Sequence, residues 1–230
     1  EANAREDVAF PSRLVVGTVD KSLKGIEEFL SFYPIEIPHV ITGYKEAESI
    51  KLFSNVYLAS RVAFFNEIDT FSKKNNLNSN DVIKGISLDH RIGDYYNKPS
   101  FGFGGYCLPK DSLCIANEVG GEILSAPGKS NLERKKFIVE EILKRLKGVE
   151  NPLVGVYKIK ERYSPLEDII LMLSENDVGV MLYEPTKKED FFLTAYINND
   201  LKDFKKKANL IISENIEDIF EDVKDKIFNI

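Results

Sequence analysis

One short segment of the sequence holds the residue types that nucleophilic chemistry needs. Cys107 stands two residues after the glycine-rich run 102–105, and Lys110 and Asp111 follow within four residues. A thiol near a helix N-terminus and an ammonium group is favoured as the thiolate, the form that attacks carbonyl carbon. An inert buried cysteine beside a surface loop would have the same local sequence. The residues alone therefore leave both interpretations open.

A second polar pair lies in a segment that the apolar spacing predicts to be a long helix. Residues 45–75 contain no Pro or Gly, and large apolar side chains recur every seven residues from Ile50 to Phe71. We interpret this stripe as core packing, in a helix long enough to bridge domains or contact a second subunit. Lys51 and Asn55 are four residues apart and would point the same way, as a site or as solvated side chains.

The elements that must position these residues begin with the end of an α/β domain. Strands are predicted at 13–17 and 35–41, with a helix at 22–32 between them. Two strands and one helix cannot close a domain. Because the first residue is also Glu and not Met, we expect a larger N-terminal domain, mostly missing from this sequence, to precede them.

The middle of the chain predicts helices around a loop. Residues 94–105 contain three glycines and two adjacent tyrosines, so this loop must adopt unusual backbone angles or approach a ligand closely. Further helices are expected from a cap at Ser79 or Asn80 to Ser87, from near Lys110 onwards, and at 132–147.

The last third alternates strands and helices, which predicts a parallel, doubly wound sheet. We therefore expect an α/β chain with three parts: the tail of an N-terminal domain at 1–43, a central helical region at 44–148 and a sheet domain at 149–230. The predicted strands are 153–157, 178–183, 209–212 and 226–230, and the predicted helices are 165–173, 201–207 and 216–223.

Composition narrows the classes of partner. The net charge is 31 − 37 = −6 and the pI is near 5.2, which argues against nucleic acid or an anionic membrane as the main partner. No apolar run approaches the length needed to span a bilayer, and two cysteines cannot form a disulfide scaffold. We expect a cytoplasmic protein without a metal site, and we interpret His39 and His90 as structural or solvent-facing.

Two stretches closely resemble a known family. Leu88-Asp-His-Arg-Ile-Gly93, continued by the run from Tyr96 to Asp111, is similar to the active-site region of UDP-glucose 6-dehydrogenases, in the UDP-glucose/GDP-mannose dehydrogenase family. The segment 46–69 resembles the central helix of that family. Weaker matches occur at 10–17 and 183–185.

The resemblance implies a role for each matched position. The nucleophile of the family falls on Cys107 and its partner acid on Asp111, while Lys51 and Asn55 fall on the pair that polarises the reacting carbonyl. The implied substrate-binding residues are Arg91, reaching in from a neighbouring subunit, together with Tyr96, Phe103, Gly104 and Lys110.

The implied reaction is oxidation of UDP-glucose to UDP-glucuronate with two NAD, through a cysteine thiohemiacetal and then a thioester. The resemblance also implies an oxidoreductase of nucleotide-sugar metabolism, acting in polysaccharide synthesis. A homodimer through the long helix is expected, with no nucleic-acid or membrane partner.

The sequence departs from the family in two places. It carries no dinucleotide-binding glycine fingerprint, so the NAD site is expected in the missing N-terminal Rossmann domain and the isolated chain is expected to be inactive. The loop after 153–157 is short, although Lys158, Lys160 and Arg162 could meet the UDP diphosphate. A non-catalytic nucleotide-sugar-binding and dimerisation module and a GDP-mannose 6-dehydrogenase remain as alternatives.

Overall fold

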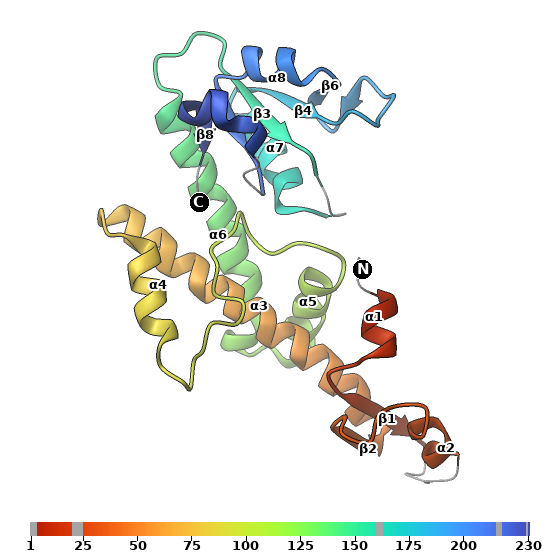
Figure 1. The fold of residues 1–230 in the computed structure, drawn as a ribbon. Coiled ribbons are helices and arrows are strands. Elements are labelled where there is room, and N and C mark those ends of the chain that lie inside the picture. The colour runs from red at the N-terminus through yellow and green to blue at the C-terminus, as the bar shows by residue number, and fades with distance from the viewer. Residues whose placement is uncertain (1–3, 20–24, 160–162, 215–217, 229) are drawn as a thin grey trace. The chain divides into compact units, whose positions relative to one another are not determined.

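The computed structural model describes residues 4–19, 25–159, 163–214, 218–228 and 230 (Figure 1). The chain divides into two compact units, Glu1–Asn55 and Val56–Ile230. The first unit contains α1 (Ala4–Ala9), β1 (Leu14–Thr18), α2 (Ile26–Leu30), β2 (His39–Gly43) and the first part of α3 (Tyr44–Lys74).

In the first unit, β1 and β2 pair in parallel, with Leu14 opposite His39. The strand predicted at 35–41 begins four residues late, because a turn in which the Ile37 N–H donates to the Pro34 carbonyl occupies its expected start. The described part of the predicted helix at 22–32 is α2, and residues 22–24 lie outside the described residues.

The long helix predicted at 45–75 is confirmed as α3, but the prediction of its buried face was wrong. Tyr57, Phe64 and Phe71 are 62%, 57% and 60% exposed. A seven-residue repeat marks one face of a helix without saying whether that face is inside. The face turned inward carries smaller or polar side chains as well as one ring: Val56, Ala59, Ala63, Phe65, Asn66 and Asp69.

Three further helices surround the glycine loop. They are α4 (Ser79–Ser87), α5 (Cys107–Val119) and α6 (Glu122–Arg145). The cap of α4 is Asn78, one residue before the predicted cap, since its side chain accepts from the Asn80 N–H at 3.1 Å. Helix α6 begins ten residues before its predicted start, because the helix continues through Pro127.

The predicted parallel, doubly wound sheet is confirmed, with an antiparallel edge that the sequence did not indicate. Its six strands run in the order β5-β6-β4-β3-β7-β8, and only β5 is antiparallel to its neighbour among the described pairs. The strands are β3 (Leu153–Tyr157), β4 (Gly179–Tyr183), β5 (Phe191–Phe192), β6 (Ala195–Asn198), β7 (Leu210–Ile212) and β8 (Ile227–Phe228).

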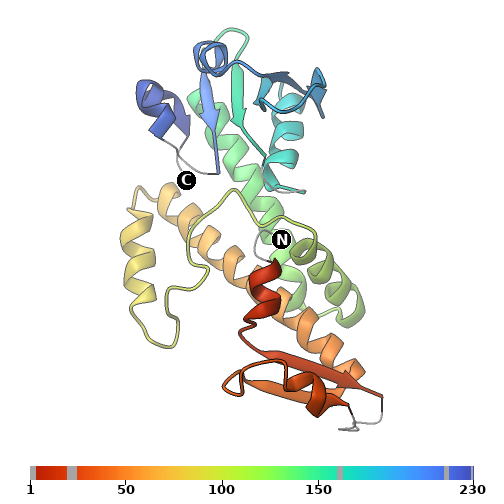
Figure 2. The same ribbon diagram turned by 45° about the vertical axis from the view of Figure 1, so that its right-hand side comes forward.

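Helices cover both faces of this sheet (Figure 2). Val154 and Val156 face α6 and α7 (Pro165–Glu175), whereas Tyr157 faces α8 (Leu201–Lys207) and the 3₁₀ helix η1 (Asp218–Lys226). Val154 and Val156 face the opposite side from Tyr157 because successive side chains of a strand point to opposite faces of the sheet. A strand that is covered on both faces therefore carries apolar side chains on both. Of the predicted helix at 216–223, residues 216–217 lie outside the described residues and the rest is 3₁₀.

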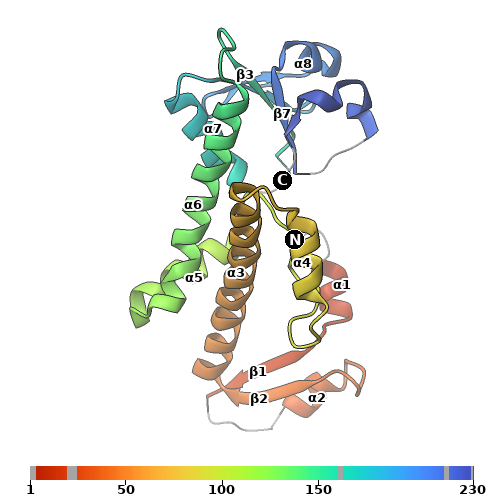
Figure 3. The same ribbon diagram turned by 90° about the vertical axis from the view of Figure 1, so that its left-hand side faces the viewer.

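The second half of α3 lies alongside α6 (Figure 3), joined by polar contacts between Asp69 and Arg134. In the part of the chain that the structure describes, none of the helices has the length and apolarity that crossing a membrane requires.

Candidate active site

Cys107 is the first residue of α5, three residues before the predicted start of that helix, and it is exposed and not in a disulfide. Tyr106 precedes it as the N-cap and makes no side-chain capping bond. The first amides of a helix lack partners within the helix and carry a partial positive charge. The thiol therefore stands where a developing anion is stabilised.

The two charged residues after Cys107 form an ion pair on the first turn of α5. The Asp111 side chain is fully buried, and the Lys110 Nζ lies 2.5 Å from its Oδ1. The pKa of Lys110 lies above its ordinary value, chiefly because Asp111 accepts its hydrogen bond, with smaller contributions from the charges of Asp111, Tyr106 and Cys107. Lys110 therefore stays protonated beside the thiol.

The loop before Cys107 inserts two aromatic rings into different clusters. The Phe101 ring is buried in the core between α6, α7 and the sheet. The Phe103 ring is buried against Ala59 and Ala63 of α3, with Leu108 packed beside them. Phe103 thus holds the loop in place, and its ring faces the protein interior.

Polar side chains of two helices hold the backbone of the same loop. The Asn66 Oδ1 accepts from the Ser100 N–H at 2.8 Å, and the Arg134 Nε donates to the Ser100 carbonyl at 2.9 Å. The Asn131 amide bonds both to the N–H and to the carbonyl of Phe103. Four backbone atoms of the loop are therefore fixed by three buried side chains.

Arg134 is itself held by a buried ion pair. Its Nη2 donates to Asp69 Oδ2 at 2.7 Å, and both side chains are almost completely buried. Burial alone would raise the pKa of Asp69, but the hydrogen bond from Lys73 and the charge of Arg134 outweigh it and hold the pKa below its usual value. The pair is ionised at neutral pH.

The end of the loop rests on the N-terminus of α7. The Gly105 N–H donates to the Tyr163 carbonyl at 3.2 Å. A Cβ on Gly104 would come within 2.5 Å of that carbonyl oxygen and 2.7 Å of Pro165 Cδ, so only glycine fits here. Gly104 brings the cysteine loop into contact with the sheet domain.

Arg91 and Tyr96 lie in the segment between α4 and the glycine loop. Arg91 is exposed and forms an ion pair with Asp89 at 2.6 Å. Tyr96 has a positive φ of 54° and stacks on Tyr95. Arg61 of α3 fixes the segment by donating to the carbonyls of Ile92, Gly93 and Tyr95.

Lys51 and Asn55 lie on α3 within the first unit, and each has an interaction partner. Cys107 and Asp111 belong to the second unit. Within the second unit, Phe103, Gly104, Cys107, Lys110 and Asp111 lie on one continuous stretch, the glycine loop and the start of α5, and Arg91 and Tyr96 lie on the segment before it.

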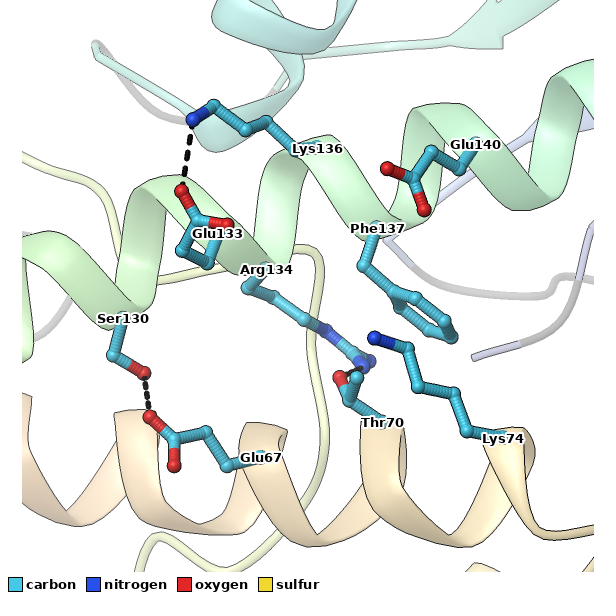
Figure 4. Close-up of a pocket in the computed structure, with 9 residues that line it drawn as sticks. All are labelled: Glu67, Thr70, Lys74, Ser130, Glu133, Arg134, Lys136, Phe137 and Glu140. Carbon is cyan, nitrogen blue, oxygen red and sulfur yellow. Dashed lines mark hydrogen bonds and ion pairs between the residues drawn. The ribbon is translucent and has the colours of Figure 1, made fainter.

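A cavity of about 170 Å³ opens between α3 and α6 (Figure 4). Charged side chains of both helices line it, including Glu67, Lys74 and Lys136, with Arg134 and Phe137 facing it. None of the residues predicted as catalytic or substrate-binding belongs to this lining. Among the described residues, no three His, Cys, Asp or Glu side chains converge as metal ligands would.

Sequence reasoning missed the four residues that hold the loops: Arg61, Asn66, Asn131 and Arg134. Their common signal is position, since each occupies the inward side of a helix. Asn131 and Arg134 precede the buried Ile138 by seven and four residues, which places all three along one helical face.

The comparisons with known proteins follow the same architecture. A sequence model of the UDP-glucose/GDP-mannose dehydrogenase family, central domain, matches residues 45–127. The UDP-glucose 6-dehydrogenase of Campylobacter jejuni is 42% identical over 100% of this chain, and that of Streptococcus pneumoniae is 35% identical over 99%. The chain spans 61% of the length of each.

Solved structures agree. A UDP-glucose dehydrogenase from Pyrobaculum islandicum aligns with a TM-score of 0.76 and 25% identity, over 94% of this chain and 54% of that one. An NDP-N-acetyl-D-galactosaminuronic acid dehydrogenase from Methanosarcina mazei shares the fold, with a TM-score of 0.79 and 18% identity over 95% of this chain and 51% of that one.

The chain belongs to the UDP-glucose/GDP-mannose dehydrogenase family. Within that family, it matches the central and C-terminal portion of the curated UDP-glucose 6-dehydrogenases.

Proposed function

We propose that this chain forms the central and C-terminal part of an NAD-dependent UDP-glucose 6-dehydrogenase, with Cys107 as the nucleophile. The observation that carries the proposal is the exposed thiol at the start of α5, beside the Lys110–Asp111 ion pair. The similarity to UDP-glucose 6-dehydrogenases supports the choice of substrate over GDP-mannose.

The residues of this chain do not fit the nicotinamide dinucleotide. The sequence has no Gly-x-Gly-x-x-Gly run, and the glycine loop before Cys107 has its backbone held by protein side chains instead of open to a pyrophosphate. NAD held by a further domain would supply both two-electron oxidations, of the sugar alcohol to the aldehyde and of the thiohemiacetal to the thioester. The 230-residue chain alone should therefore give no turnover with UDP-glucose and NAD, and a normal rate would contradict this.

Cys107 acts on the aldehyde oxidation level of the sugar. Its thiolate sulfur bonds to the carbonyl carbon and the carbonyl π electrons move to oxygen, giving a thiohemiacetal. Lys51 and Asn55 donate hydrogen bonds to that oxygen, and each such donor typically contributes about 3 kcal/mol. Their spacing of one helical turn on α3 lets both point to one oxygen.

Asp111 acts after the sugar carbon has reached the thioester level. Water adds to the carbonyl carbon, the C–S bond breaks, and the sugar leaves as a carboxylate while Cys107 returns as a thiolate. Asp111 orients this water and accepts one of its protons, and the other passes to solvent as the product ionises; Lys110 keeps the Asp111 carboxylate ionised beforehand. The product is UDP-glucuronate, a precursor for polysaccharide synthesis in this proposal.

The sheet domain is proposed to bind the nucleotide. Strand β3 lies between β4 and β7, and the chain reverses its order there, so the carboxyl ends of β3 and β7 form the switch point where α/β sheets bind ligands. Lys158 follows β3 at this edge, and Lys160 and Arg162 lie outside the described residues. Arg91, Tyr96, Gly104 and Lys110 are proposed to contact the sugar nucleotide, with Phe103 fixing their loop.

We further propose a cytoplasmic homodimer in which the exposed rings of α3 meet a second copy. Tyr57, Phe64 and Phe71 lie on one side of the helix and are mostly exposed. A partner subunit would then supply Arg91 to the site.

The test uses the complete protein and the two cysteines of α5. Cys107→Ser should abolish UDP-glucuronate formation, because an alcohol is a far weaker nucleophile than a thiolate. Cys114→Ser, on the same helix, should leave the rate unchanged. A Cys107→Ser protein that makes UDP-glucuronate at the wild-type rate would overturn the proposal, and preference for GDP-mannose would correct the substrate.

A further inference from the structure

One buried side chain outside the proposed catalytic set forms two hydrogen bonds to the backbone of the loop that leads to Cys107. The Asn131 side chain of α6 accepts a hydrogen bond from the Phe103 N–H at 2.8 Å and donates one to the Phe103 carbonyl at 2.9 Å. Asn131 is only 6% exposed. A side-chain amide that pairs with both polar atoms of one residue fixes the position and the orientation of that peptide segment.

The loop is shaped to admit this amide. A Cβ on Gly102 would stand 2.6 Å from the Asn131 Oδ1, and the φ of Gly102 is +143°, which L residues rarely adopt. Asn131 and Gly102 thus fit each other, and no larger residue than glycine leaves the contact intact.

Three residues earlier, the backbone of Ser100 is held in the same way, by hydrogen bonds from buried side chains. Asn66 and Arg134 take the N–H and the carbonyl of Ser100, at 2.8 and 2.9 Å. The ion pair with the buried Asp69 holds the Arg134 side chain in the position where it bonds to Ser100. The loop backbone is therefore held at Ser100, and Asn131 holds it again at Phe103, closer to Cys107.

Only Gly104, Gly105 and Tyr106 separate Phe103 from Cys107 in the sequence. Leu108, the second residue of α5, packs on the same cluster as the Phe103 ring. The start of α5 is thereby tied to the place of Phe103. We propose that Asn131 is a positioning residue for Cys107, acting through the backbone of Phe103.

This inference rests on the proposed role of Cys107 as the nucleophile. A merely structural Asn131 would also be buried and bonded, so its loss would lower stability and nothing else. A positioning Asn131 lowers the rate of acid formation at saturating substrate, because a nucleophile displaced by about 1 Å loses about a hundredfold in rate. Binding of the UDP-sugar changes less than the rate, because the proposed contacts Arg91 and Tyr96 lie outside the stretch from Phe103 to Cys107.

The experiment compares variants of the complete protein with UDP-glucose and NAD. Asn131→Leu keeps the size and removes both hydrogen bonds, and it should lower kcat by about tenfold to a hundredfold, with a clearly smaller change in KM for UDP-glucose. Ser130→Ala, which removes the adjacent bond from α6 to Glu67, is the control for a lost contact between α6 and α3. Ile142→Val is the control for lost stability in α6. Both controls should keep the wild-type kcat.

Gly102→Ala tests the same contact from the loop and serves if Asn131→Leu does not fold. It should lower kcat, and in combination with Asn131→Ala the loss should be smaller than the product of the two separate losses, because the smaller side chain removes the clash. A multiplicative loss would show that the two residues do not act through one contact and would overturn the inference.

Two results separate the inference from the proposed function. Wild-type kcat in Asn131→Leu, or a loss no larger than in Ile142→Val, overturns the positioning role while Cys107→Ser still abolishes activity. If Cys107→Ser retains activity, the nucleophile itself is wrong and both proposals fail.

Discussion

The sheet domain and the helices around Cys107 have opposite kinds of interior. Between α6, α7 and one face of the sheet, the buried cluster is built mainly from apolar side chains, with Val154, Ile169 and Leu173 fully buried. Between the second half of α3 and α6, the buried contacts are polar, built on Asp69, Arg134 and the loop backbone. Apolar burial therefore stabilises the first region, and buried hydrogen bonds and an ion pair stabilise the second.

The difference follows from what each region must do. Apolar burial is non-directional, and it stabilises a sheet without fixing any one backbone atom closely. Hydrogen bonds from buried side chains fix chosen atoms, and they cost far more when one partner is lost. We therefore expect a polar interior beside the nine-residue stretch from Phe101 to Pro109, because this stretch must hold the Cys107 thiol in one place.

The largest expected effect comes from breaking the polar interior. Arg134→Ala removes one of the two cationic partners of the buried Asp69, leaving Lys73, and also removes the bonds of Arg134 to Ser100, Asn66 and Thr70. Together these losses should cost about 4 kcal/mol in the free energy of unfolding. Lys136→Ala on the same helix removes an exposed ion pair with Glu133 and should cost less than about 0.5 kcal/mol. Urea unfolding measures both, and equal midpoints would show that the polar interior contributes little.

How much the sequence predicts differs between the two regions for the same reason. The strands at 153–157 and 209–212 were predicted closely, because apolar residues flanked by helices leave a pattern. The family resemblance placed Cys107 and Asp111 as candidates. The segment Ser130-Asn-Leu-Glu-Arg-Lys-Lys136 looks instead like a solvated helix surface, and nothing in its composition shows which polar side chains turn inward.

Long-range pairing explains the other differences. The strands β5 and β6 are short and lie at one edge of the sheet, so their residues carry little apolar pattern. The aromatic stripe of α3 was assigned to the core from its spacing alone, whereas the side that is buried was selected by the partners Arg134 and Phe103.

The next largest effect tests the apolar interior. Ile169→Ala in α7 removes a fully buried side chain and should cost about 3 kcal/mol in the free energy of unfolding. Leu171→Ala on the same helix is partly exposed and should cost less than about 1 kcal/mol. If the comparison holds, Ile169→Ala keeps its kcat at temperatures where it remains folded, whereas Arg134→Ala does not. A fall in kcat for Ile169→Ala would show that the two interiors are coupled.

A smaller effect comes from titrating the polar interior. The folded pKa of Asp69 is below its unfolded value, so its stabilising contribution is fully present above the unfolded pKa of about 3.9 and is lost as the pH falls through the folded pKa. The urea midpoint of the wild type should therefore fall more steeply below pH 4 than that of Asp69→Asn. Parallel curves for the two proteins would show that Asp69 is not stabilised in its ionised form.

The smallest expected effect compares two thiols on one helix. Cys107 and Cys114 are both exposed, but only Cys107 stands at the start of α5 beside Lys110. Limiting iodoacetamide followed by peptide mapping should label Cys107 several times faster at neutral pH, because the negative charge on a reacting sulfur there meets the ammonium and the partial positive charge of the first helical amides. Lys110→Met removes the ammonium and should reduce this preference, whereas Lys129→Met on α6 should not. Equal slow labelling of both cysteines would mean that exposure alone, and not the charge around the helix start, sets the reactivity of Cys107.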